Sequence, residues 1–186
     1  MLLDTGVGIL LSIITSWFFQ TKLTIFLILA GIVFSLLPDL DFLIELLKHG
    51  SVGGKVIREH REIFHYPLSY LPIILLVFIF FGEIIAIFLS LCLFAHFLHD
   101  SIGIGWGIKW LWPFSQKSYK FFSDKKGLFC CRPIVSWEKK ELEKIVAQYG
   151  DPDWIKNIYF KLSPILVVEF LFLVLSVIFL FFYTNI

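Results

Sequence analysis

The sequence predicts an all-α, polytopic membrane protein with about five transmembrane helices. Hydrophobic residues make up 58% of the 186 residues, above the level of about 45–50% that is usual in soluble domains. Five apolar stretches are continuous rather than alternating, and helices satisfy their own backbone hydrogen bonds in lipid. The stretches cover residues 6–19, 23–37, 68–82, 84–98 and 162–183.

The lengths of the stretches predict how they cross the bilayer. A bilayer core needs about 20 helical residues, and only the last stretch supplies them comfortably. The first four are shorter and require flanking residues, tilt or local thinning of the bilayer to span it. Residues 20–22 and 82–83 separate neighbouring stretches so briefly that each pair is expected to form a tight helical hairpin. We therefore expect one membrane-embedded domain over residues 1–186.

The basic residues are distributed very unevenly between the two sides of this arrangement. With five spans, residues 38–67 and 99–161 lie on the same side as the N-terminus, and 15 of the 16 Lys and Arg residues fall in these two loops. Cytoplasmic loops carry an excess of Lys and Arg. The N-terminus and both polar loops are thus expected in the cytoplasm and the C-terminus outside. The net charge of +1 offers no bulk attraction to nucleic acid, which is not an expected partner.

Residues 116–157 form a polar insertion before the last apolar stretch. Ser136 is a candidate N-cap, and Gly150 stops the helical spacing of apolar residues that follows it. The pattern predicts a short amphipathic helix of about 12 residues on the cytoplasmic side. The helix could lie on the membrane surface, cover a site, or be a plain solvated helix.

Polar clusters capable of chemistry stand where the apolar stretches end. If the spans alternate as expected, all three clusters reach the cytoplasmic face together. His96 and Asp100 are four residues apart and so share one face of a helix. The clusters are Asp39 and Asp41; His60, Arg61, Glu62 and His65; and His96, His99 and Asp100.

Imidazole and carboxylate groups in this mixture favour a divalent metal such as zinc, manganese or iron. The candidate ligands are Asp39, Asp41, His60, His65, His96, His99 and Asp100. They exceed the needs of one ion, so either two ions bind or some of these groups orient the ligands. Arg61 is suited to bind phosphate or carboxylate, and Glu62 or Asp41 could act as a general base.

Structural interpretations of the same residues stay open. The aspartates could cap a helix or pair with Arg61, and the histidines could be interfacial polar residues. Two non-enzymatic functions are therefore alternatives: a structural or regulatory Asp/His network, and a metal transporter. Ionisable groups buried in membranes are usually functional, and the positions of these groups at the ends of spans argue against a transport path.

The motifs resemble those of the YdjM-like family, LexA-regulated inner-membrane proteins of bacteria and archaea. The resemblance covers roughly residues 30–115 and is carried by Pro38-Asp39-Leu40-Asp41, His60-Arg61 with His65, His96 with Asp100-Ser101, a Gly-rich stretch, and Trp112-Pro113-Phe114-Ser115. It implies a small helical membrane protein with metal-dependent hydrolase activity, whose Asp and His motifs bind the metal.

Two departures from the family pattern concern the site. Thr5 is followed by Gly6, where family members often carry a Thr-His pair, and His65 is followed by Tyr66 where a Ser is common. His99 could compensate for the missing histidine.

The expected activity is attack of metal-activated water on an ester or phosphoester. The expected partners are a lipid-like or lipid-linked substrate and the bilayer.

Overall fold

The computed structural model describes residues 1–49, 64–103 and 105–185. These residues belong to two compact units, and the division falls inside helix α5 (Glu83–Ile102), after His96. Unit 1 comprises Met1–Leu37, Pro72–His96 and Ile155–Ile186, and unit 2 comprises Pro38–Leu71 and Phe97–Trp154.

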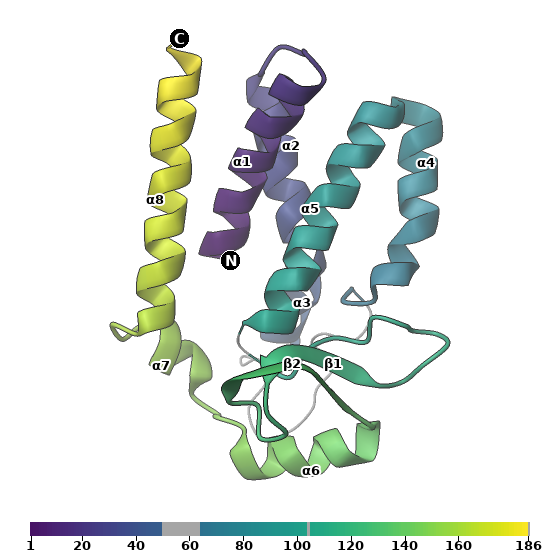
Figure 1. Ribbon diagram of the computed structural model, residues 1–186, viewed down its shortest axis with the longest axis vertical. Coiled ribbons are helices and arrows are strands. Elements are labelled where there is room, and N and C mark those ends of the chain that lie inside the picture. Colours follow the sequence, from purple (N-terminus) through teal and green to yellow (C-terminus); the bar gives the residue numbers. More distant parts are fainter. Residues whose placement is uncertain (50–63, 104, 186) are drawn as a thin grey trace. The chain divides into compact units, whose positions relative to one another are not determined.

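Unit 1 is helical, and its helix α1 packs against both α2 and α8 (Figure 1). The unit consists of α1 (Leu2–Phe18), α2 (Ile25–Leu36), nearly all of α4 (Leu71–Phe81), the first part of α5, most of α7 (Trp154–Tyr159), and α8 (Pro164–Thr184). Two of these helices begin at side-chain caps. Thr24 accepts from the N–H of Leu27 at 3.2 Å at the start of α2, and Ser163 accepts from the N–H of Leu166 at 3.0 Å at the start of α8, which satisfies helix donors that have no intrahelical partner.

Small residues bring α1 and α2 close together. Gly8 on α1 lies against Gly31 on α2, and a Cβ atom at either position would meet the backbone of the other helix. Ser12 Oγ also donates across this contact to the carbonyl oxygen of Leu27 at 3.1 Å. Such close approach lets helices associate in lipid, where the hydrophobic effect does not drive them together.

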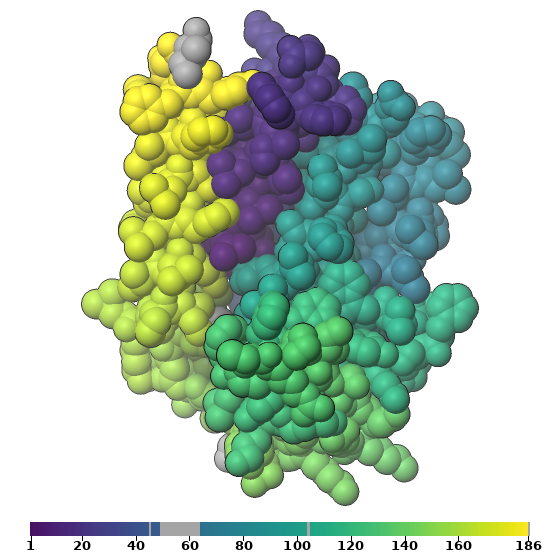
Figure 2. Space-filling view, in the orientation of Figure 1, coloured from purple at the N-terminus to yellow at the C-terminus, as the bar shows by residue number. Residues whose placement is uncertain are grey.

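Three helical segments within the described ranges are long and apolar enough to cross a membrane: Ile25–Lys48, Glu83–Ile102 and Pro164–Thr184. The helices over Leu2–Phe18 and Pro67–Phe81 are apolar but shorter. Figure 2 shows the side chains of α8, in yellow, at the surface, where many bulky apolar groups are exposed. The prediction of a mostly helical membrane protein is confirmed, with three candidate spans rather than the expected five.

Unit 2 corrects the all-α prediction, because it contains an antiparallel β-hairpin. Its elements are the 3₁₀ turn η1 (Leu37–Asp39, from Pro38), α3 (Leu40–His49), the 3₁₀ turn η2 (Pro67–Tyr70), the end of α5, β1 (Ser118–Ser123), β2 (Phe129–Trp137) and α6 (Lys139–Tyr149). Ser118 pairs with Trp137 and Phe121 with Ile134. Aromatic residues on both strands, the β-branched Ile134 and Val135 on β2, and a Gly-containing turn between the strands are the physical reason for the hairpin.

The core of unit 2 joins the hairpin to α6. Val135 and Trp137 of β2 are buried against Leu142 and Val146 of α6. The amphipathic helix expected in this region is present and ends before Gly150, as predicted. It begins at Lys139 rather than after Ser136, because Ser136 pairs with Tyr119 in the β-ladder.

Candidate metal site

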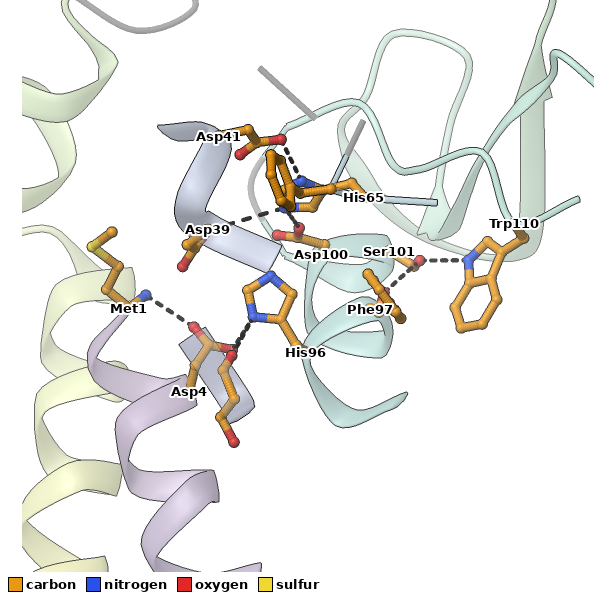
Figure 3. Close-up of polar contacts among 12 residues, drawn as sticks. Met1, Asp4, Asp39, Asp41, His65, His96, Phe97, Asp100, Ser101 and Trp110 are labelled. Atoms are coloured by element: carbon orange, nitrogen blue, oxygen red, sulfur yellow. Dashed lines mark hydrogen bonds and ion pairs between the residues drawn. The ribbon is translucent and has the colours of Figure 1, made fainter. Parts of the chain in front are cut away.

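His65 lies among three carboxylates in unit 2 (Figure 3). Its Nδ1 donates to Asp41 Oδ2 at 2.8 Å. Its Nε2 lies 3.0 Å from Asp100 Oδ2 and 4.0 Å from Asp39 Oδ1. The imidazole is fully buried at 0% exposure, and Asp41 and Asp100 are buried as well. A histidine and three aspartates from separate parts of the sequence thus form one polar cluster.

Local structure fixes the position of His65. Tyr66 has the extended backbone that is favoured before a proline, and Pro67 begins η2. The Tyr70 hydroxyl donates to the carbonyl oxygen of Phe64 at 3.0 Å. This bond joins η2 to the residue before His65, so the histidine sits in a closed turn.

The three carboxylates come from two helical ends. Asp39 ends η1, and Asp41 lies in the first turn of α3. Asp100 lies in the last turns of α5. A helix boundary of this kind places carboxylates on a short, well-ordered segment rather than on a long loop, which favours a defined geometry.

Burial and the neighbouring carboxylates act in opposite directions on the protonation of His65. Burial alone disfavours the imidazolium, but hydrogen bonds to Asp100 and Asp41 and the charges of these carboxylates raise the pKa of His65 above its usual value. A concentration of negative charge around one imidazole equally favours a bound cation.

The donor atoms fit a divalent metal. Because Asp41 holds the Nδ1–H, the Nε2 edge of the ring is directed toward Asp100 and Asp39. A carboxylate that holds the second nitrogen of a histidine is the usual support of a metal-binding imidazole. The ligand atoms of Asp39 and His65 lie within 4.8 Å of each other, and their nitrogen and oxygen donors suit zinc, manganese or iron.

Unit 1 contains a second buried polar cluster, around His96 (Figure 3). The Nδ1 of His96 donates to the carbonyl oxygen of Ser35 at 2.7 Å and lies 3.5 Å from Asp4 Oδ1. Donation from Nδ1 makes Nε2 the nitrogen that carries the lone pair. Glu169 of α8 is buried in the same unit and accepts from the Tyr159 hydroxyl at 3.2 Å. Asp4 and Glu169 were not among the predicted site residues, although Glu169 is a lone carboxylate within the apolar stretch 162–183, which is a recognisable signal.

The predicted ligands divide into three groups. Asp39, Asp41, His65 and Asp100 come together in unit 2. His96 belongs to unit 1 and lies one helical turn before Asp100 on α5, and His99 has its ring beside Gly103 of the same chain segment. The candidates His60, Arg61 and Glu62 lie outside the described residues.

The segment after α5 packs beside the residue that follows His65. Trp112 stacks on Tyr66 with ring centroids 4.6 Å apart, and Lys109 Nζ lies 3.4 Å from the Tyr66 hydroxyl. Trp110 Nε1 donates to Ser101 Oγ at 2.8 Å, directly after Asp100. The buried Lys109 is a cation near the site that the sequence analysis did not single out.

Comparison with known proteins identifies relatives in the membrane. A family model described as YdjM inner membrane protein matches residues 4–186. Inner membrane protein YbcI of Escherichia coli (strain K12) is 34% identical over 102 residues, which are 50% of this chain and 57% of that protein. The match therefore spans little more than half of the relative's length. No solved structure matches the chain.

Proposed function

The chain belongs to the YdjM family of inner membrane proteins, and from that premise we propose that it is a membrane-bound, metal-dependent hydrolase. Its substrate would be an ester or phosphoester, carried on a lipid. The observation that supports this proposal most strongly is the environment of His65: a buried imidazole held at Nδ1 by Asp41, with Nε2 beside Asp100 and Asp39.

In this proposal His65, Asp39 and Asp100 hold the metal, and Asp41 orients His65. His96 is a further proposed ligand, because the helical spacing places it on the same face of α5 as Asp100. When bound, the ion would polarise the scissile group and lower the pKa of water to about 7. Of the seven candidates of the sequence analysis, four are thus proposed as ligands and Asp41 as the residue that supports a ligand, while His60 and His99 are given no role.

The protein's own groups would supply proton transfer and substrate binding. Asp41 keeps the proton of His65 on Nδ1 through the 2.8 Å hydrogen bond. A carboxylate of this cluster that is not engaged as a ligand, or Glu62, would accept the proton of the attacking water. Arg61 would bind the anionic group of the substrate through its planar guanidinium.

Hydrolysis of a panel of phosphoesters and carboxylic esters by detergent-purified protein tests the proposal. We expect turnover by the wild type that is lost in Asp39→Ala and in His65→Ala, while both variants keep their elution volume and helical circular dichroism. Asp153→Ala, which changes an exposed aspartate outside the cluster, is the matched control. Full turnover by a folded Asp39→Ala protein would refute the assignment of the site.

A structural network is the second candidate function, and one observation favours it. His65 has carboxylates at both ring nitrogens, so an imidazolium could pair with Asp41 and Asp100 without a metal. This alternative predicts that chelators leave the thermal unfolding of the purified protein unchanged and that no ester in the panel is cleaved. A chelator-sensitive turnover would exclude it.

A further inference from the structure

The hairpin of unit 2 is covered along only half of its length. Val135 and Trp137 of β2 are buried against α6. From Phe129 to Ile134, by contrast, most residues of β2 are exposed on both faces of the ribbon, and Phe129 itself is 77% exposed. A two-stranded ribbon that exposes large apolar side chains on both faces is not stabilised by its own packing, so this half needs a partner.

A distortion of β1 adds an aromatic ring to the exposed half. The register shifts between Phe121 and Ser123, and the intervening Phe122 has a φ of 51°. A bulky residue in the left-handed region is strained, and bulges often redirect a side chain. Here the bulge leaves Phe122 exposed, on the same half of the hairpin as Phe129.

The turn between the strands fixes a second set of exposed groups. Asp124 Oδ1 accepts from the N–H groups of Lys126 and Leu128, at 2.8 and 2.9 Å. Leu128 and Lys126 are both exposed, and Arg132 is exposed on β2. The outer half of the hairpin therefore combines large apolar side chains with basic ones, which is the composition of segments that lie in the interface of an anionic membrane.

The position of the hairpin in the chain favours a lipid partner over a protein. It lies between α5 and α8, both of which are long and apolar enough to cross a membrane. A segment anchored at both ends in this way stays within reach of the bilayer surface whatever its orientation. The apolar and basic side chains of the hairpin are thus held at a high local concentration near the anionic lipid surface.

We propose that the outer half of the hairpin, residues 122–134, docks on an anionic phospholipid surface. The four large apolar side chains enter the headgroup region, and Lys126 and Arg132 contact the anionic headgroups. The apolar side chains are Phe122, Leu128, Phe129 and Ile134. This docking is independent of the proposed hydrolase activity, because none of these residues belongs to the His65 cluster.

The native cysteines make a direct test possible. Cys131 is exposed in the proposed docking segment, whereas Cys92 is buried. A Cys130→Ser variant would be labelled at Cys131 with a bimane fluorophore and placed, one protein per disc, in nanodiscs of phosphatidylcholine and phosphatidylglycerol. We expect brominated lipid to quench this label. The control is a protein that lacks Cys130 and Cys131 and carries the label at Lys144→Cys, on the exposed side of α6. Brominated lipid is not expected to quench the control label.

Two variants separate the apolar and the charged contributions. Leu128→Ser combined with Phe129→Ser is expected to abolish the quenching. Arg132→Gln is expected to lower the docked-to-undocked ratio about fivefold in anionic discs, since one basic residue near an anionic surface contributes about 1 kcal/mol, and to have no such effect in discs of phosphatidylcholine alone.

The comparison of the two labels decides the question even if the Leu128→Ser/Phe129→Ser or Arg132→Gln protein fails to fold. A label at Cys131 that brominated lipid quenches no more than the label at Lys144→Cys would overturn the proposal. So would a disulfide between two copies through Cys131 in discs that hold two proteins, because a second copy would then cover this surface.

Discussion

Replacement of Asp41 by Asn tests the role of the carboxylate that supports His65. The substitution preserves the size of the side chain and an oxygen that can accept from Nδ1, but it removes the negative charge from a 2.8 Å contact that is buried on both sides. Hydrogen bonds to charged groups contribute about 1.5–3 kcal/mol, and loss of a carboxylate that orients a metal-binding histidine typically weakens metal binding about 10–100-fold. We therefore expect the Kd for zinc or manganese to rise by about 10–100-fold in Asp41→Asn.

The assay is a competition titration of purified protein against a chromophoric chelator, with the elution volume and the helical signal as checks of folding. Asp153→Asn makes the same chemical change at an exposed position and is expected to leave the Kd unchanged. An Asp41→Asn protein that is folded and binds metal as tightly as the wild type would show that the Asp41–His65 hydrogen bond does not support a metal site.

Three further predictions concern packing, the helix α5 and the membrane topology. Gly8→Leu should lower the melting temperature in detergent, because the backbone of α2 occupies the space beside Gly8 and overpacking costs about 1–3 kcal/mol. Val33→Leu, at an exposed position of α2, is the control and should leave the melting temperature unchanged. Equal melting temperatures of the two variants would contradict the close contact between the helices. His96→Ala should reduce the bound metal per protein more than His99→Ala does, as measured by elemental analysis; the reverse order would favour His99 as the ligand. In intact spheroplasts, a membrane-impermeant thiol reagent should spare Cys131 and label Asn185→Cys, and labelling of Cys131 would reverse the predicted orientation.

The helical architecture was predictable because it depends on the content of apolar residues over long stretches. Three of the five predicted stretches belong to helical segments that are long enough to span a membrane, and two of these segments extend several residues beyond the predicted stretch. The hairpin was not predicted, since Cys130-Cys131 and Pro133 break the alternation of β2 and only Val135 and Trp137 show which face is covered. The β-structure of residues 129–134 depends on pairing with β1. A single stretch of sequence does not show which segment it pairs with.

The candidate site was predictable in part. Asp39, Asp41, His65 and Asp100 were selected from the sequence by residue type and by their places at span ends, and they do come together in unit 2. The sequence could not rank these groups, because the separation of an orienting carboxylate from a possible ligand depends on which ring nitrogen each one faces. The buried Lys109 was missed for a related reason: burial of a lysine depends on the aromatic residues that pack around it.

Elemental analysis of the detergent-purified protein shows directly whether the His65 cluster binds a metal. The measurement compares the wild type with Asp39→Ala/His65→Ala, after reconstitution of both with zinc, manganese and iron in turn and removal of unbound ion. We expect one or two equivalents of one of these metals in the wild type and a loss of that metal in a variant that remains folded. A wild-type protein that retains none of the three, or a variant that retains the same amount, would contradict it.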